Sequence, residues 1–199
     1  RVWVWSPPAL PGGQSGWPLA LNRRLIQRGL EQMAWWLDFK HWILWTYNPL
    51  TALYLDLRSH PISVYHCVDR IQEQPGMPTE RIDAWEERLC RAVQVVFTTS
   101  PDLQATHSRW NHHTYFHGNV ADFQHFNRAL QQPSLACPKP LTAIPRPRLL
   151  FTGAIDAYKL DLPMTVTLAR TNPNWSFVFV GPVGEADPST ELAALKTCP

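Results

Sequence analysis

The sequence lacks most of the features that direct a chain to a membrane, a metal cluster or a polyanion. No apolar run approaches the roughly 20 residues that cross a bilayer, and the start, "RVWVWSPPALPGG", has no secretory pattern. The four cysteines include no C-x-x-C pair, which argues against a zinc ribbon and a thioredoxin-type site. The net charge is only +2, so charge alone implies no nucleic-acid partner. We therefore expect a soluble protein in a reducing, cytoplasmic setting.

The sequence does contain enough apolar material for a core, and its periodicity changes repeatedly between strand-like and helix-like. Hydrophobic residues make up 45% of the 199 residues and charged residues 17%, a mix typical of one large or two small folded domains. Strand-like patterns fall at residues 2–5, 42–47, 63–69, 93–99, 114–117, 148–153 and 175–181. Helix-like patterns fall between or after them, at 18–37, 50–58, 82–93, from 101 onward, and at 122–126, 162–170 and 188–196. Strands that alternate with helices predict an α/β fold with open parallel sheets and right-handed crossovers.

A proline-rich stretch at residues 131–147 separates two such alternating regions. It contains Pro133, Pro138, Pro140, Pro145 and Pro147, a composition typical of a stiff, extended connector. We predict an N-terminal domain over residues 1–130, this linker, and a second domain over residues 148–199.

The helix predicted near residues 82–93 is amphipathic. Its apolar face is formed by Ile82, Trp85, Leu89 and Val93. We place Glu80, Glu86, Glu87 and Arg88 on its other, solvent-facing side. The next helix is expected to begin at Ser100-Pro101, with Ser100 as the N-cap and Pro101 at the first helical position.

Polar or small residues follow several predicted strands. In open parallel sheets, ligands bind outside the carboxyl ends of the strands, which singles out Asn48, Asp69, Ser100 and Gly153. The carboxylate of Asp69 can orient a hydroxyl or assist proton transfer, and the alternative is a cap for the following loop. Since successive residues of a strand alternate sides, His66 does not share the face of Asp69, and we interpret it as a packed or sheet-face histidine.

Six segments, in this order, carry a resemblance to a known family: "WTYNP", "VYHCVD", "VVFTTSPDL", "HGNVADFQHF", "RLLFTGAIDAYKLD" and "PNWSFVFVGP". They resemble the glycosyltransferases of the GT-B class, group 1, which form retaining family 4. The resemblance spans essentially the whole chain and implies two Rossmann-like parallel-sheet domains. It also implies an enzyme that moves a sugar from a nucleotide diphosphate donor to a polysaccharide or lipid-linked acceptor, with no metal or other cofactor.

The resemblance also implies roles for individual residues. Asp69 is the expected catalytic residue. Asn48 and Ser100, together with the "HGN" turn of His117, Gly118 and Asn119, are expected to line the acceptor side of the cleft. Gly153, Ala154 and Lys159 are expected to bind the donor diphosphate. Gly153 has no Cβ and lets the diphosphate approach the backbone, Ala154 keeps that approach open, and Lys159 supplies a point charge. The alternative for Lys159 is a solvated surface cation.

The chain departs from that family at both ends. The family's first strand and glycine-rich turn are absent upstream of Val2, and the paired glutamates that hold the donor ribose and sugar are expected beyond Pro199. In many relatives an arginine stands where this chain has Ala154. We therefore expect both domains to be incomplete, and we expect this chain to transfer no sugar, because electrostatic positioning of the diphosphate and the sugar supplies most of the catalysis.

Histidines gather in one part of the sequence. Five of the eight lie between His107 and His125, and His113 and His117 have the i, i+4 spacing of some zinc sites. That spacing brings two ligands together on a helix, whereas "HTYFH" is typical of a strand. We therefore expect no metal there.

Tryptophans are frequent near a basic segment. Trp35, Trp36, Trp42 and Trp45 lie close in sequence to Arg23, Arg24, Arg28 and Lys40, as interfacial membrane binding requires. We favour burial of these rings in the core, because several lie in or beside the strand predicted at 42–47. At most, we expect weak peripheral contact with the inner face of a membrane.

Two other classes of function remain open. A sugar-nucleotide epimerase of the same architecture would also bind a nucleotide diphosphate, but would release a free or epimerised sugar. A non-catalytic interaction module would bind a partner through an open sheet edge and exposed tryptophans.

Overall fold

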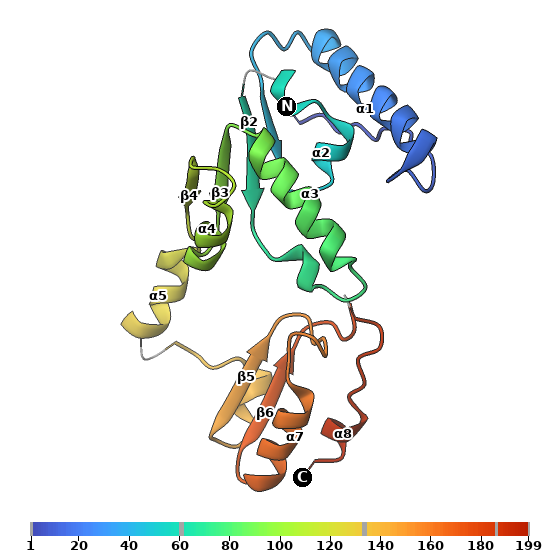
Figure 1. The fold of residues 1–199 in the computed structure, drawn as a ribbon. Helices are drawn as coiled ribbons and strands as arrows, with labels where there is room; N and C mark the ends of the chain where they lie inside the picture. The colour runs from blue at the N-terminus through green and yellow to red at the C-terminus, as the bar shows by residue number, and fades with distance from the viewer. Residues whose placement is uncertain (1, 60–61, 133–134, 186, 199) are drawn as a thin grey trace. The chain divides into compact units, whose positions relative to one another are not determined.

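The computed structural model describes residues 2–59, 62–132, 135–185 and 187–198 (Figure 1). The chain divides into two compact units, Arg1–Val120 and Ala121–Pro199. Each unit contains a parallel β-sheet with helices, so the predicted α/β class with parallel sheets is confirmed. The predicted domain limits, residues 1–130 and 148–199, stay a prediction.

The first unit is built on a four-stranded parallel sheet in the order β1-β2-β3-β4. The strands are β1 (Ile43–Thr46), β2 (Ile62–Cys67), β3 (Val95–Thr98) and β4 (Thr114–Phe116). The helices are α1 (Gly16–Trp36), α2 (Thr51–Tyr54), α3 (Thr79–Ala92) and α4 (Pro101–His107), with short 3-10 turns at Leu57–Ser59 and Ile71–Glu73. Because neighbouring strands follow one another along the chain, right-handed crossovers place the connecting helices on one face of the sheet. Figure 1 shows α2 and α3 on the same side of β2.

The core of this unit lies between the sheet and those helices. It contains Ala52, Leu57, Tyr65, Cys67, Leu89, Cys90, Val93, Val96 and Leu103. On α3 the buried residues are Ile82, Glu86, Leu89 and Cys90. The predicted place of Glu86 on the solvent-facing side of this helix is therefore wrong. Its spacing from Ile82 and Cys90 puts it on the same helical face as both.

Large side chains are exposed on the other face of the sheet. Successive residues of each strand alternate sides, and the register of the strands therefore places four side chains on this face: Ile43, Trp45, Ile62 and Tyr115. All four are exposed. Trp45 is 46% exposed, and Trp35 and Trp36 at the end of α1 are 81% and 63% exposed. The predicted burial of these three rings in the core is wrong. Trp45 lies on the sheet face opposite the core, and Trp35 and Trp36 lie at the exposed end of α1.

The first residues pack against α1 instead of forming the strand predicted at 2–5. The Trp5 ring lies against Gly29, where an added Cβ would come within 2.3 Å of a ring carbon. The rings of Trp3 and Trp36 meet edge to face, with centroids 5.9 Å apart. Trp3 and Trp5 thus pack against α1, and this packing holds residues 2–5 without strand pairing.

The second unit contains a two-stranded parallel sheet, β5 (Arg148–Thr152) and β6 (Ser176–Val180), joined through α7 (Leu162–Thr171). Its other helices are α5 (Phe123–Gln131), α6 (Lys139–Thr142) and α8 (Ala193–Lys196). Asp122 caps α5 by accepting a hydrogen bond from the His125 amide at 2.9 Å. The stretch predicted as an extended connector contains the short helix α6, and α8 is shorter than the helix predicted at 188–196.

Asn111 joins the end of α3 to the start of β4. Its side-chain amide donates to the carbonyls of Cys90 and Val93 at 2.8 and 2.9 Å. Its Oδ1 accepts from the His113 amide at 2.8 Å. Carbonyls at a helix end have no partner within the helix, so Asn111 satisfies groups that would otherwise need water.

We predict that Asn111→Ala lowers the free energy of unfolding of the first unit by about 2 kcal/mol, because it removes several partly buried hydrogen bonds. The matched control is His112→Ala at the exposed neighbouring position, which should change that free energy by less than about 0.5 kcal/mol. Urea unfolding followed by far-UV circular dichroism measures both changes. Equal stability of the two variants would contradict the role given to Asn111.

Candidate functional site

The loop after β2 is held on both sides of Asp69. The Thr99 hydroxyl donates to the Val68 carbonyl at 2.6 Å, and the Arg70 guanidinium pairs with the Asp102 carboxylate. Asp69 itself is exposed, and within the described ranges no hydrogen bond or ion pair reaches its carboxylate. The strand ends at Cys67, two residues earlier than predicted, because the Val68 carbonyl accepts its hydrogen bond from the Thr99 hydroxyl and not from a strand amide. Asp69 is thus a free carboxylate on a fixed loop.

Asn48 lies in the turn before α2, and Ser100 begins α4. The Asn48 Oδ1 accepts from the Leu50 amide at 2.9 Å, in the turn before α2. The Ser100 Oγ accepts from the Leu103 amide at 3.2 Å, so its predicted role as the N-cap of α4 is confirmed. A turn bond accounts for the Asn48 side chain, and capping accounts for that of Ser100, without a ligand.

The "HGN" turn follows β4 and is exposed at all of its residues, His117, Gly118 and Asn119. The His117 amide donates to the Thr98 carbonyl at 2.9 Å, and the His117 ring lies edge-on to the Phe97 ring. His66 lies on the same sheet face, between the rings of Tyr47 and Phe97, as the sheet-face interpretation predicted. The pKa of His66 is lowered mainly by burial and, to a smaller extent, by the nearby His117.

In the second unit, Gly153 follows β5 directly. Its φ of +138° lies in the region that favours glycine, and a Cβ built there would meet nothing closer than 4.0 Å. The chain does not turn at Gly153, since its amide donates to the Val180 carbonyl at 3.0 Å and pairing continues at Ile155 and Val183. The turn comes later, where the amides of Lys159 and Leu160 both donate to the Asp156 carbonyl at 3.0 Å. Gly153 and the half-buried Ala154 therefore leave one side of the backbone open.

Lys159 lies beside a carboxylate that sequence reasoning did not consider. Its Nζ is 3.9 Å from Oδ2 of Asp156, which is fully buried, and it lies 5.2 Å from the centre of the Tyr158 ring. Contact with Tyr158, and then the charge of Asp156, raise the pKa of Lys159, so its amine is charged. The D-x-x-K spacing was visible in the sequence and could have indicated this pair.

Lys159 also lines a pocket in the second unit. Its walls include Tyr158, Asp161, Val166, Ser189 and Glu191. Asp161 is occupied as the N-cap of α7, where its Oδ1 accepts from the Met164 amide at 2.9 Å. The pocket thus combines one lysine, a hydroxyl and an aromatic ring with two carboxylates.

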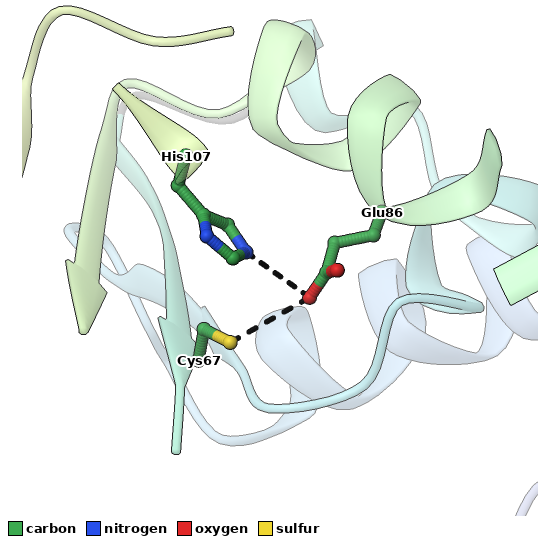
Figure 2. A group of neighbouring side chains, drawn as sticks. All are labelled: Cys67, Glu86 and His107. Carbon is green, nitrogen blue, oxygen red and sulfur yellow. Dashed lines mark hydrogen bonds and ion pairs between the residues drawn. The ribbon is translucent and has the colours of Figure 1, made fainter. Parts of the chain in front are cut away.

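A buried polar cluster lies beneath the sheet of the first unit, formed by Cys67, Glu86 and His107 (Figure 2). The Oε1 atom of Glu86 lies 3.2 Å from Nε2 of His107 and 3.6 Å from Sγ of Cys67. The Tyr65 hydroxyl also donates to this oxygen. All four side chains are buried, with Glu86 the most exposed at 3%. The cluster ties β2, α3 and α4 together.

The charges of this cluster are set by competition between burial and contact. Burial opposes a charge on His107, but its contacts with Cys67 and Glu86 outweigh burial and raise its pKa to about 10. Burial also opposes a charge on Glu86, but His107 and Tyr65 outweigh it and hold the pKa of that carboxyl below its ordinary value. Burial, and then the neighbouring acidic groups, raise the pKa of the Tyr65 hydroxyl. At neutral pH, Glu86 and His107 therefore form an ion pair.

Sequence reasoning missed this cluster for two reasons. Its members lie on three different elements, so no spacing along the chain brings them together. Glu86 was also assigned to the wrong face of its helix. The histidine pair that does have a metal-like spacing, His113 and His117, lies at the two ends of β4, which forms a strand as predicted.

Comparisons with known proteins give no family assignment. No protein-family model matches the chain, and no curated protein matches it significantly. Among the helices of the described residues, none combines the length and apolar character needed to cross a membrane. The fold and the geometry of these residues are therefore the basis for a proposed function.

The ion pair gives the first unit a defined pH dependence. The pKa of His107 rises from an ordinary 6.5 to about 10 on folding, so the folded unit keeps a proton that the unfolded chain releases. This contribution to stability is complete below the ordinary pKa and is lost as the pH rises through the folded value. Glu86 has a lowered pKa, so its contribution is present above its ordinary pKa and is lost as the pH falls through the folded value.

We predict that the free energy of unfolding of the first unit falls as the pH rises from 6.5 to about 10. A chelator is present in the measurement, so that metal ions do not bind the cysteine, histidine and carboxylate side chains. Glu86→Gln should remove most of this slope, because His107 then loses the carboxylate that raises its pKa, and should destabilise the unit by roughly 3 kcal/mol, because it removes one partner of a buried pair. Glu87→Gln is the control, since Glu87 forms only a partly exposed pair with Arg91. Urea midpoints across this pH range provide the measurement. A flat profile in the parent chain, or equal effects of the two substitutions, would contradict the assignment.

Proposed function

We propose that this chain is part of a nucleotide-sugar-dependent glycosyltransferase of the GT-B class. In this proposal the first unit serves the acceptor, a polysaccharide or lipid-linked glycan, and the second unit binds the nucleotide diphosphate of the donor. The observation that carries it is the end of β5, where Gly153 leaves the backbone open and a charged lysine follows at Lys159. The two parallel sheets support the proposed architecture.

A diphosphate in the second unit would meet an uncovered stretch of backbone at Gly153 and one exposed cation, Lys159. Gly153 offers an open approach because no side chain covers it. The Lys159 side chain is 44% exposed, so its amine can face a ligand at the surface while it lies 3.9 Å from Oδ2 of the buried Asp156. The start of α7 adds its partial positive charge. In this proposal these groups contribute part of the charge stabilisation that a leaving diphosphate requires, and the proposal includes no metal.

In the first unit, Asp69 is the residue proposed to act on the acceptor. Its carboxylate is exposed, while bonds at Val68 and Arg70 fix the loop on either side. A carboxylate held in this way can accept a hydrogen bond from a sugar hydroxyl and take its proton. Asn48, Ser100 and the turn at His117 to Asn119 lie at the same carboxyl ends of the strands and are proposed to contact the acceptor.

The proposed setting is the cytoplasm, with weak contact at the inner face of the membrane. The cysteines of the chain are free thiols, as a reducing compartment favours. Trp35 and Trp36 are exposed at the end of α1, which also carries Arg23, Arg24 and Arg28. Basic and aromatic side chains on one helix favour interfacial contact.

A second candidate is a non-catalytic interaction module. The exposed sheet face with Ile43, Trp45 and Tyr115 favours it, since contiguous exposed apolar surface is typical of interaction sites. Nucleotide binding separates the two, because an interaction module has no need of a diphosphate site. A sugar-nucleotide epimerase would share that site and is distinguished by its products.

We predict that Lys159→Ala weakens the binding of a nucleoside diphosphate by roughly one to two orders of magnitude, because it removes a charge-assisted hydrogen bond to phosphate. Lys139→Ala, which removes an exposed lysine on α6 outside the pocket, should leave the affinity unchanged. Calorimetric titration with uridine and guanosine diphosphates compares the three proteins. Equal, measurable affinity in the parent and Lys159→Ala would contradict the role of Lys159, and no binding by the parent would contradict the proposed function.

A further inference from the structure

The buried cluster of Cys67, Glu86 and His107 contains three different metal-ligand groups on three elements. A thiol from β2, a carboxylate from α3 and an imidazole from α4 point toward one another (Figure 2), and their ligand atoms all lie within 4.8 Å of one another. Side chains that converge from separate elements are held by the packing of the fold and not by a local turn.

Two of the three ligand separations in the cluster fit a tetrahedral ion, and the third, between Cys67 and His107, is no more than 4.8 Å. With zinc bond lengths of about 2.0 Å to nitrogen and oxygen and about 2.3 Å to sulfur, tetrahedral ligands lie about 3.3 Å apart for nitrogen and oxygen and about 3.5 Å apart for sulfur and oxygen. The observed separations from Glu86 Oε1 are 3.2 Å to His107 Nε2 and 3.6 Å to Cys67 Sγ. Small movements of the side chains therefore suffice to admit an ion between them.

The groups around the cluster are those that orient metal ligands. The other ring nitrogen of His107, Nδ1, lies 2.7 Å from the Leu103 carbonyl, to which it can donate, and this leaves Nε2 facing the cluster. The Tyr65 hydroxyl donates to Glu86 and fixes its carboxylate. A histidine whose second nitrogen donates to a carbonyl is the usual arrangement for a metal ligand.

The charge of the cluster also suits a divalent ion. Without a metal, the cluster holds a carboxylate beside an imidazolium and a thiol. With a metal, the ligating forms are thiolate, carboxylate and neutral imidazole, whose two negative charges balance a dication. The buried charge is then zero in both states, so loading adds no uncompensated charge to the core.

We propose that Cys67, Glu86 and His107 form a binding site for a divalent transition metal ion, with Zn²⁺ as the best fit. A thiolate and an imidazole favour zinc or cobalt over magnesium or calcium, which prefer all-oxygen ligands. The metal stabilises the first unit by joining β2, α3 and α4. It takes no part in sugar transfer, so this proposal stands independently of the proposed function.

The test uses Co²⁺ as a spectroscopic probe on the tag-free, reduced 199-residue chain. Cys137→Ser and Cys198→Ser are introduced first, so that only the two buried thiols, Cys67 and Cys90, remain. We expect this background protein to take up one Co²⁺ with a thiolate-to-cobalt charge-transfer band, to release protons on binding, and to exchange the ion for Zn²⁺. Its thermal midpoint should rise with metal.

Two further variants locate the site. Cys67→Ser should lose the charge-transfer band and weaken Zn²⁺ binding more than about 100-fold, since even the loss of an outer-shell partner costs up to that much. Cys90→Ser is the matched control, because Cys90 is equally buried in the same core but lies outside the cluster, and it should keep the band.

Several results would overturn the proposal. One is a folded background protein that takes up no stoichiometric Co²⁺, and another is a band that survives Cys67→Ser but disappears with Cys90→Ser. Should Cys67→Ser fail to fold, X-ray absorption of the Co²⁺-loaded background protein decides instead. One sulfur with nitrogen and oxygen neighbours supports the site, and a shell without sulfur contradicts it.

Discussion

The first unit depends on a single buried carboxylate. Glu86 extends from α3 toward β2, where the Tyr65 hydroxyl, the Cys67 thiol and the His107 imidazole all approach one of its oxygens. A charge at that depth is costly unless several partners surround it, so each partner must stay in place for the others to be tolerated. The carboxylate thereby fixes the positions of α3 and α4 on the sheet.

The exposed loop after β2 is also held in place. Cys67 ends β2, and the loop that follows is held through Val68 and Arg70 to residues at the start of α4. The carboxylate of Asp69 therefore extends into solvent from a loop with little freedom of its own. In the second unit, by contrast, the cation at Lys159 is exposed and lies 3.9 Å from its buried partner, Asp156.

Much of the fold could be predicted because it follows from local patterns. The apolar run around Val95–Thr98, the cap at Ser100 and the strand at Arg148–Thr152 each lie within a short segment and form as the sequence indicates. Glu86 and Trp45 were misplaced, because burial depends on which face of an element meets the rest of the chain. Helical spacing from Ile82 to Cys90 could have corrected Glu86. No local pattern could have shown that the helices cover the sheet face opposite Trp45, or that His107 meets Cys67.

The ionised state of His107 is the most direct test of this account, because the buried carboxylate needs a positive partner. Nitrogen-15 NMR of the metal-free chain at about pH 8 distinguishes an imidazolium from either neutral tautomer. We predict that both ring nitrogens of His107 carry protons at this pH. A neutral His107 under the same conditions would contradict it.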